Sequence, residues 1–514
     1  MRRTRDRYAR AHLSGARRYF NVVLHAHLPW VKRAGEWPFG EEWFYQAMDD
    51  VYLPLLDALA RLRAEGVRGA LTIGVTPVLL EMLRDPYLTA KFDEYLAARA
   101  ALLESDTVRS SGPRQRELAR DSRDRVLALR DRWIHTYERD LVGALREYVR
   151  AGDVEILTGA ATHAYLPLLF DERSVALQLR TGIETTRSAF GVDPAGIWLP
   201  ECGYHPRLQA QLEALGIRYF YADARAAAPS GASPLVPLRL PASPLAYFAS
   251  DPGALRFVMD AEDGYPADPA YREFHKRHER SGARYWRITG RDAELSEKDL
   301  YDPQRARERA ADHAAAFAAI VRERTSAASA GAPYMSLAFD AEFFGHWWSE
   351  GLLWLEALLY AVRDGGAATF CSPSAYLERH PAIKEYALAA SSWGEGGDDR
   401  TWRNDATAWM WEELHQMEIR SIEVARRANS SGPEFEQAAR ELMLAQSSDW
   451  TYYATKGGAG TYPQARFATH RDRWAAACAA ACKRPVSSKE LADAYRDDSC
   501  FQRLDASPLC RVQA

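Results

Sequence analysis

The sequence has no long hydrophobic run, few cysteines and no excess of charge of either sign. No window of eighteen or more residues is apolar and free of charge, so we expect no transmembrane helix and no membrane partner. Only six of the 514 residues are Cys, which favours reduced thiols and a cytoplasmic location over a disulfide-rich secreted fold. The 66 Lys and Arg against 70 Asp and Glu give a net charge of −4, which argues against a nucleic-acid partner.

The chain does have a large apolar content and many tryptophans. Apolar residues make up 47% of the chain, enough for a substantial core, and 15 residues are Trp. Such an excess of Trp favours a surface that binds weakly polar ligands such as sugars, because aromatic faces stack against them. Residues 1–18 are basic but lack the apolar core of a secretory signal, and are predicted to be a leader outside the folded domains.

From Tyr19 onward, short apolar runs alternate with amphipathic helical segments. This alternation predicts a parallel sheet, closed or nearly closed into a (β/α) barrel. Each predicted strand carries polar residues at its carboxyl end, so the chemistry is expected at one mouth of the barrel. The predicted buried strands lie within residues 19–30, 69–80, 153–167, 196–206, 217–224 and 332–345.

Three segments interrupt the alternation and suggest the domain organisation. Residues from about 92 to 150 are helical and highly charged, which predicts a helical insertion. Residues from about 226 to 300 are rich in Pro, Gly and Asp, which predicts a long mobile loop region over the barrel mouth. The pattern from 386 to 514 is helical, so we expect a barrel domain over 19–385 followed by an α-helical C-terminal domain.

Three histidines follow predicted strands at the barrel mouth. His25 and His27 share one face of a strand end, because side chains alternate with period two, and His163 follows another strand. Such a group suits either a metal ion or a row of sugar hydroxyls. Any one of the three, taken alone, would more often bond the backbone at a strand end.

Two predicted strands also lead into carboxylates. Glu201 follows the strand that contains Trp198, and Asp340 ends another strand, with Glu342 on the same side. A single carboxylate after a strand is often only a helix cap. Two in opposed environments provide what glycoside cleavage requires, one ionised and one protonated. The residues alone leave open whether Asp340 or Glu342 is the second member of the pair.

Four tryptophans lie close together after residue 390. Trp393 and Trp402 border a Gly-rich stretch and are predicted to contact a ligand. Trp409 and Trp411 lie in an amphipathic helical segment and are predicted to belong to the core. A second Gly-rich loop at 456–460 follows no strand and has no phosphate-binding pattern.

These motifs resemble those of glycoside hydrolase family 57, and within it they are most similar to the 1,4-α-glucan branching enzymes. The resemblance implies an incomplete (β/α)7 barrel with a helical insertion and an α-helical C-terminal domain. It covers nearly the whole chain, from about Tyr19 to about Arg473. The five motifs, in the family's order and spacing, are HAHLP at 25–29, GAATHAYLP at 159–167, WLPECGY at 198–204, FDAEFFGHWW at 339–348 and SSWGEGG at 391–397.

The resemblance also implies a reaction and the residues that perform it. Glu201 would be the nucleophile and Asp340 the general acid/base of a retaining double displacement, which cleaves α-1,4 links and forms α-1,6 branches in glycogen synthesis. An α-1,4-glucan, amylose or glycogen, would be donor and acceptor, with no metal or other cofactor, and the enzyme would be a monomer or a small homo-oligomer. The implied substrate-binding positions are His25, His27, Trp37, His163, Tyr265, His346, Trp393, Trp402 and Asp449.

The chain departs from the branching-enzyme pattern near the loop whose Tyr265 is implied to keep water from the intermediate. Ser250 stands where Arg is expected, and Ala267 stands where Gly is expected. An α-amylase or a 4-α-glucanotransferase of the same family is therefore the alternative. A metal-dependent carbohydrate deacetylase is the more distant alternative, since such enzymes also use a seven-stranded barrel with His and Asp at strand ends.

Overall fold

The computed structural model describes residues 17–110, 112–260, 262–328, 331–381, 383–427 and 432–510. Almost all of the predicted basic leader, residues 1–18, lies outside these ranges. Within them, no helix combines the length and the apolar character that crossing a bilayer requires.

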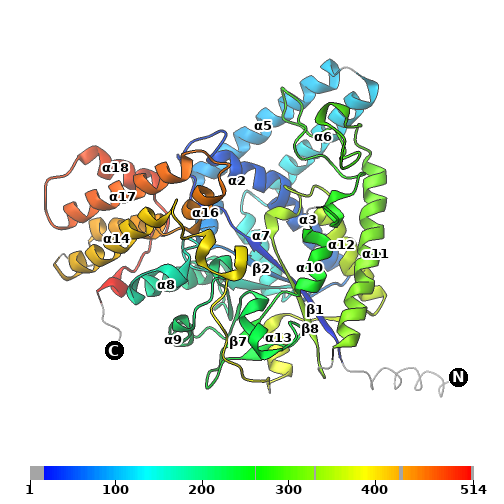
Figure 1. The fold of residues 1–514 in the computed structure, drawn as a ribbon. Coiled ribbons are helices and arrows are strands. Elements are labelled where there is room, and N and C mark those ends of the chain that lie inside the picture. The colour runs from blue at the N-terminus through cyan, green and yellow to red at the C-terminus, as the bar shows by residue number, and fades with distance from the viewer. Residues whose placement is uncertain are drawn as a thin grey trace.

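Seven parallel strands form the sheet at the centre of the molecule (Figure 1). Six of them lie within the predicted strand segments, which confirms those predictions. Two short strands extend the sheet: β6 (Leu238–Arg239) pairs antiparallel with β7, and β9 (Thr369–Phe370) pairs with β1. In spatial order the parallel strands are β7 (Ala246–Phe248), β5 (Tyr219–Tyr221), β4 (Gly196–Trp198), β3 (Val154–Thr158), β2 (Leu71–Val75), β1 (Tyr19–Ala26) and β8 (Tyr334–Asp340).

The two outer parallel strands, β7 and β8, meet at one point and leave the barrel incomplete. Ser250, just past β7, forms a single bridge with Ser336 of β8. The Ser250 hydroxyl accepts a hydrogen bond from the Ala338 backbone N–H at 2.8 Å. Among the described strands, β7 and β8 share no ladder beyond this bridge. The predicted incomplete seven-stranded barrel is confirmed, and Ser250 belongs to its seam.

The predicted loop region at 226–300 is more ordered than the sequence suggested. It contains β6, β7 and helix α10 (Pro252–Met259), so the prediction of one long loop is wrong for its first part. The apolar run that contains β7, residues 245–249, lies between Pro244 and Pro252 in a segment rich in Pro and Gly, which is typical of a loop. From residue 262 to 300 the chain is irregular, with only short helical turns.

Several helices begin at an Asp-Pro pair, which explains where they start. The side chains of Asp85, Asp251 and Asp302 accept backbone N–H groups in the first turns of α5 (Pro86–Arg109), α10 and α11 (Pro303–Ala327). Proline is favourable at the first helical position because its missing N–H would have no helical partner there.

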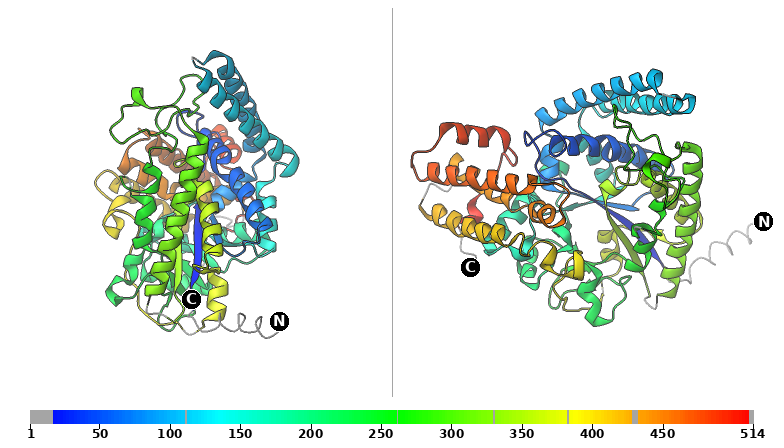
Figure 2. Two further views of the ribbon diagram at one scale, coloured as in Figure 1. Left: turned by 90° about the vertical axis from the view of Figure 1, so that its right-hand side faces the viewer. Right: turned by 45° about the horizontal axis from the view of Figure 1, so that its top comes forward.

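Helices surround the sheet, and two of them extend away from it (Figure 2). α5 and α6 (Pro113–Asp131) pack side by side and project from the barrel, as we expected of the helical insertion at about 92–150. α7 (Leu141–Arg150) lies in the same predicted segment but packs on β3 as an ordinary crossover helix. The other helices of the barrel region are α2 (Glu41–Ala47), α3 (Leu53–Ala64), α4 (Pro77–Leu83), α8 (Glu172–Phe190), α9 (Gln209–Ala214), α12 (Gly351–Asp364) and α13 (Pro373–Arg379).

A helical region lies beside the barrel, coloured yellow to red in Figure 1. The backbone carbonyl of Asp497, at the end of α18, accepts the Trp30 indole N–H at 2.9 Å, which joins this region to the loop after β1. Buried His470 and Glu441 form a 2.8 Å contact that joins α17 to α15. The helices are α14 (Ala408–Arg427), α15 (Pro433–Ala445), α16 (Ser448–Lys456), α17 (Tyr462–Ala481) and α18 (Ser488–Asp497).

Candidate functional site

The carboxyl ends of the strands open into a cleft with a volume of about 820 Å³. Strand ends, the loop after α13 (Pro373–Arg379) and the start of α16 all contribute to it. Ten of the residues considered from the sequence line the cleft, so the structure brings together nearly all of the predicted site. They are His25, His27, Trp37, His163, Glu201, Asp340, Glu342, His346, Trp393 and Asp449.

Backbone strain is concentrated at two of these positions. Glu201 follows β4 in a short turn with φ 61° and ψ 22°, and the adjacent Cys202 has φ 49°. His163, after β3, has φ 58°. A left-handed backbone at a residue other than glycine costs about 1–3 kcal/mol and persists where the surrounding contacts hold it, most often at functional sites. The strained turns direct both side chains into the cleft.

Both oxygens of the Glu201 carboxylate accept hydrogen bonds from segments outside the barrel strands. The Trp393 indole Nε1–H donates to Oε2 at 2.7 Å, and the Ser448 hydroxyl donates to Oε1 at 2.8 Å. Burial raises the pKa of Glu201, while these two bonds oppose the rise by stabilising the charged form. The side chain is therefore fixed in orientation, and the two donors favour its ionised state.

Asp340 and Glu342 lie in different environments, although the sequence placed them on the same side. The Asp340 carboxylate opens into the cleft, and no group among the described residues donates a hydrogen bond to it. The side chain is exposed to the cleft, but desolvation deep in the cleft, and then the charges of Glu342 and Glu201, raise the pKa of Asp340 to about 8. Glu342 instead accepts hydrogen bonds from the Tyr52 hydroxyl and, at 3.1 Å, from the His27 backbone N–H. Burial raises the pKa of Glu342 to about 7. Asp340 is thus the protonated group that is free to face a substrate.

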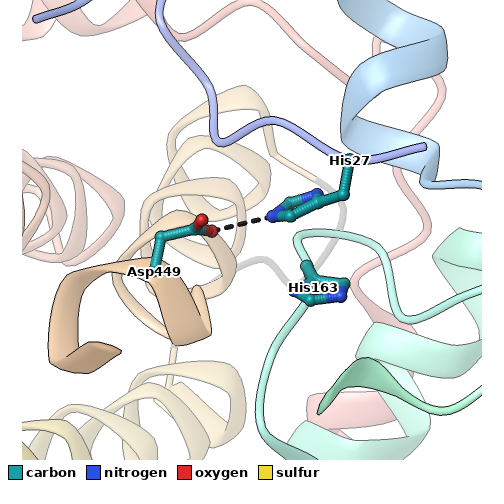
Figure 3. Close-up of side chains that lie close together, drawn as sticks. All are labelled: His27, His163 and Asp449. Carbon is teal, nitrogen blue, oxygen red and sulfur yellow. Dashed lines mark hydrogen bonds and ion pairs between the residues drawn. The ribbon is translucent and has the colours of Figure 1, made fainter. Parts of the chain in front are cut away.

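His27, His163 and Asp449 form a cluster on one wall of the cleft (Figure 3). His27 Nε2 lies 2.9 Å from Asp449 Oδ2, and the imidazole rings of His27 and His163 stack at 3.8 Å. Burial lowers the pKa of His27, but the Asp449 carboxylate, with smaller contributions from Glu201 and Glu342, outweighs this effect, and the net pKa is raised. All three residues were predicted to belong to the site, whereas the direct contact between His27 and Asp449 was not predicted.

Within the described ranges, two groups of residues lie close enough to share a cation, and both are hydrogen-bonded clusters in this structure. The first is His27, His163 and Asp449. The nitrogens of His163 face His25 and Ser448, each at 3.0 Å, rather than a point shared with the other two residues. The second is Glu441, His470 and Asp498. There the Arg466 guanidinium lies 2.9 Å from His470 Nε2 and Arg473 pairs with Asp498, and these positive charges oppose a cation.

Exposed aromatic side chains line the cleft, and some of them were missed in the sequence. Trp37 is 75% exposed and Trp347 is 57% exposed. The Trp347 ring stacks on Phe274, with centroids 4.7 Å apart. Trp347 follows His346 in the FGHWW motif, which could have indicated it, whereas Phe274 lies in the irregular segment and had no such signal. Exposed aromatic faces of this kind suit sugar rings.

The structure corrects the predictions for two of the four clustered tryptophans. Trp402 is fully buried and stacks on Tyr165 at 4.3 Å, so the prediction that it contacts a ligand is wrong. Trp411 is buried, as predicted, whereas Trp409 is 38% exposed and does not belong to the core. Trp402 lies in the loop before α14, where its ring packs on Tyr165 and against Gly394, whereas Trp409 lies on the first turn of α14.

Tyr265 does not line the cleft. Its ring stacks on His313 of α11 with centroids 4.4 Å apart, and it is half-buried there. Ala267 lies in the same short turn. In this conformation Tyr265 therefore does not cover the site, contrary to the prediction from the resemblance.

An incomplete barrel whose mouth carries two carboxylates in opposed environments, beside exposed aromatic rings, defines an enzyme that acts on carbohydrates. The model of glycosyl hydrolase family 57 matches residues 21–389, and that of the 1,4-alpha-glucan branching enzyme C-terminal domain matches residues 413–508. The chain belongs to glycosyl hydrolase family 57. The predicted family is thereby confirmed.

Known relatives cover almost the whole chain. It is 36% identical over 489 residues to a 1,4-alpha-glucan branching enzyme of Thermococcus kodakarensis, covering 88% of this chain and 72% of that protein. It is 33% identical over 530 residues to a probable 1,4-alpha-glucan branching enzyme of Mycobacterium tuberculosis, covering 95% of this chain and 98% of that protein.

Solved structures show the same architecture. The crystal structure of the Thermococcus kodakaraensis branching enzyme superposes with a TM-score of 0.91 at 33% identity, over 96% of this chain and 97% of that one. The alpha-amylase AmyC of Thermotoga maritima gives a TM-score of 0.86 at 28% identity, over 97% of this chain and 100% of that one. The fold is thus shared by a branching enzyme and an amylase.

Proposed function

We propose that this enzyme is a 1,4-α-glucan branching enzyme that cleaves an α-1,4 link and transfers the released glucan segment to a 6-hydroxyl group. The observation that carries the proposal is the contrast between the two carboxylates. Glu201 receives two hydrogen bonds that favour its charged form, whereas Asp340 receives none and its pKa is raised to about 8. The two donors favour the ionised form of Glu201, whereas the raised pKa of Asp340 favours its protonated form at neutral pH, and a double displacement requires this contrast.

In the first step, a Glu201 carboxylate oxygen attacks the anomeric carbon while Asp340 gives its proton to the departing glycosidic oxygen. The products are a glycosyl ester on Glu201, a shortened glucan and an ionised Asp340. In the second step, Asp340 takes the proton of an acceptor 6-hydroxyl, whose oxygen attacks the anomeric carbon and releases Glu201. Water in place of the acceptor gives hydrolysis instead.

The other cleft residues bind the glucan substrate. His27, His346 and Asp449 offer hydrogen-bonding groups to sugar hydroxyls, while Trp37 and Trp393 offer aromatic surface. His25 and His163 line the cleft but are hydrogen-bonded to each other, and His163 also to Ser448, so they support the site from behind. Amylose or glycogen serves as donor and acceptor, and the protein works as a monomer or a small homo-oligomer. The barrel over 19–385 carries the two carboxylates, and the region 386–514 completes the cleft. The six free cysteines support a location in the reducing cytoplasm.

One observation favours the alternative of α-amylase activity. Tyr265 packs against His313 and does not cover the cleft, so in this conformation water has access to the intermediate. The solved amylase shares the fold at 28% identity. The two activities differ only in the acceptor, so the products distinguish them.

The test is incubation of the purified protein with amylose, followed by measurement of reducing ends before and after an enzyme that cleaves only α-1,6 bonds. A branching enzyme gives new reducing ends only after debranching. Reducing ends that rise beforehand, without branches, would show a hydrolase. Glu201→Gln and Asp340→Asn should each lower either activity by about a thousandfold or more while thermal unfolding stays similar. Activity that a chelator abolishes would point to the metal-dependent alternative.

A further inference from the structure

A chain of buried hydrogen bonds leads from His25 to Glu201. His25 Nε2 lies 3.0 Å from His163 Nε2, and His163 Nδ1 lies 3.0 Å from the Ser448 hydroxyl oxygen. The Ser448 hydroxyl in turn donates to Glu201 Oε1 at 2.8 Å. His25, His163 and Ser448 are buried and only Glu201 is partly exposed, so water does not compete for these hydrogen bonds.

The number of available hydrogens fixes which group donates and which accepts in each of these hydrogen bonds. A serine hydroxyl has one hydrogen, which Ser448 donates to Glu201, so it can only accept from His163. His163 therefore carries its proton on Nδ1, and Nε2 of the neutral ring is an acceptor. His25 must then donate through Nε2, which leaves its Nδ1 as a bare lone pair. That atom is buried and has no hydrogen-bond partner among the described residues, and an unpaired acceptor is tolerated better than an unpaired N–H.

The imidazoles of His25 and His163 are both neutral. Burial, followed by the charge of His27, lowers the pKa of His25 and of His163 well below its ordinary value. The ionisable groups that face Glu201 are the acids Asp340 and Asp449, the histidines His27 and His163, and the hydroxyls of Tyr165, Tyr452 and Tyr453. The adjacent Cys202 stays a thiol because burial raises its pKa.

The start of α16 is tied to the barrel, which holds Ser448 in place. The Ser448 backbone N–H donates to the His163 carbonyl at 3.1 Å, and Ser447 forms an antiparallel bridge with Ala164. Ser448 and His163 are therefore joined through both backbone and side chain. A residue from the C-terminal helical region thus reaches a catalytic side chain that is placed by β4.

We propose that Ser448 is a positioning residue that fixes the Glu201 carboxylate in one orientation and stabilises its ionised form, with His163 and His25 setting the direction of the Ser448 hydroxyl. The proposal rests on the proposed role of Glu201 as nucleophile. It adds that the C-terminal region contributes to the nucleophile itself and not only to the walls of the cleft.

The first experiment is the pH profile of Ser448→Ala. Loss of the hydroxyl removes a bond that favours the charged carboxylate, so the acid limb of kcat/KM, which reports ionisation of Glu201, moves to higher pH. At neutral pH kcat falls about tenfold with little change in KM. Ser448→Thr, which keeps a hydroxyl, restores the wild-type acid limb. The control Thr451→Ala removes a hydroxyl of the same helix that bonds only the Ser448 carbonyl, and leaves the profile unchanged.

The second experiment uses wild-type protein labelled with 15N at histidine, and so does not depend on a variant that folds. NMR at pH 7 should show His163 protonated on Nδ1 alone and His25 on Nε2 alone. The opposite tautomers, an imidazolium at either residue, or an unmoved acid limb in a folded Ser448→Ala variant would overturn the proposal. If Glu201→Gln retains full turnover, the role of Glu201 fails instead, so the two failures are distinguishable.

Discussion

Trp393 holds Glu201 through both its backbone and its side chain. Its backbone N–H donates to the Glu201 carbonyl at 3.0 Å, and its indole N–H donates to Oε2 at 2.7 Å. The Trp393 ring also packs edge-on against Trp198 of β4, with centroids 5.3 Å apart. The loop after α13 therefore fixes the strained turn that carries Glu201, and the cleft depends on a segment nearly 200 residues away in the sequence.

Replacing Trp393 with Phe should weaken catalysis through Glu201. The change keeps an aromatic face but removes the N–H, so the charged carboxylate loses a donor and the acid limb of kcat/KM moves to higher pH. At neutral pH we expect kcat to fall about tenfold. The control is Trp409→Phe, since the Trp409 indole donates only to the Ala406 carbonyl, on the protein surface. An unchanged acid limb in Trp393→Phe would contradict the assignment.

Removing the Glu342 charge should make Asp340 more acidic. The pKa of Asp340 is raised to about 8 by burial and by the charges of Glu342 and Glu201. The general acid must be protonated, so activity is present below this pKa and is lost as the pH rises through it. In Glu342→Gln the pKa falls, and the alkaline limb of kcat/KM moves to lower pH. Glu356→Gln, which removes a carboxylate on α12 that pairs with Arg61, should leave that limb in place.

Replacing Asp449 with Asn should lower the pKa of His27. The Asp449 carboxylate is the main group that raises the pKa of His27 against the effect of burial, with smaller contributions from Glu201 and Glu342. Without it, the His27 pKa should fall relative to wild type, and NMR titration of the ring can follow the change. At neutral pH we expect kcat/KM to fall about tenfold, because a charge-assisted hydrogen bond in the cleft is lost. A His27 pKa equal to that of wild type would show that another group holds its charge.

Trp402 and Trp37 should respond to replacement in opposite ways. Trp402 is fully buried against Tyr165, so Trp402→Ala leaves a cavity and should lower the free energy of unfolding by about 3–5 kcal/mol. Trp37 is 75% exposed, so Trp37→Ala should change that free energy by less than about 0.5 kcal/mol and instead raise KM for amylose. Urea unfolding and steady-state kinetics measure the two effects. A marginal unfolding change in Trp402→Ala would contradict its place in the core.

The sequence by itself determined the alternation of strands and helices and the positions of the polar residues at the carboxyl ends of the strands. Six parallel strands were predictable because buried strands in a barrel are continuous apolar runs, and His25, His163, Glu201 and Asp340 were predictable because they follow those runs. The strand β7 was missed because its short apolar run lies between prolines. Trp402 and Trp409 were misassigned because the sequence does not say that the loop before α14 buries Trp402 or that the first turn of α14 leaves Trp409 exposed.

Only the tertiary structure decided which carboxylate is free and what controls the other. Asp340 and Glu342 are equivalent by strand alternation, but Glu342 meets Tyr52 and the His27 backbone, and Asp340 faces the open cleft. The contacts of Glu201 come from Trp393 and Ser448, which lie 192 and 247 residues away along the chain. Local pattern fixes the direction of a side chain relative to its own strand. Its pKa and orientation depend on distant segments, because burial and hydrogen bonds act through space rather than along the sequence.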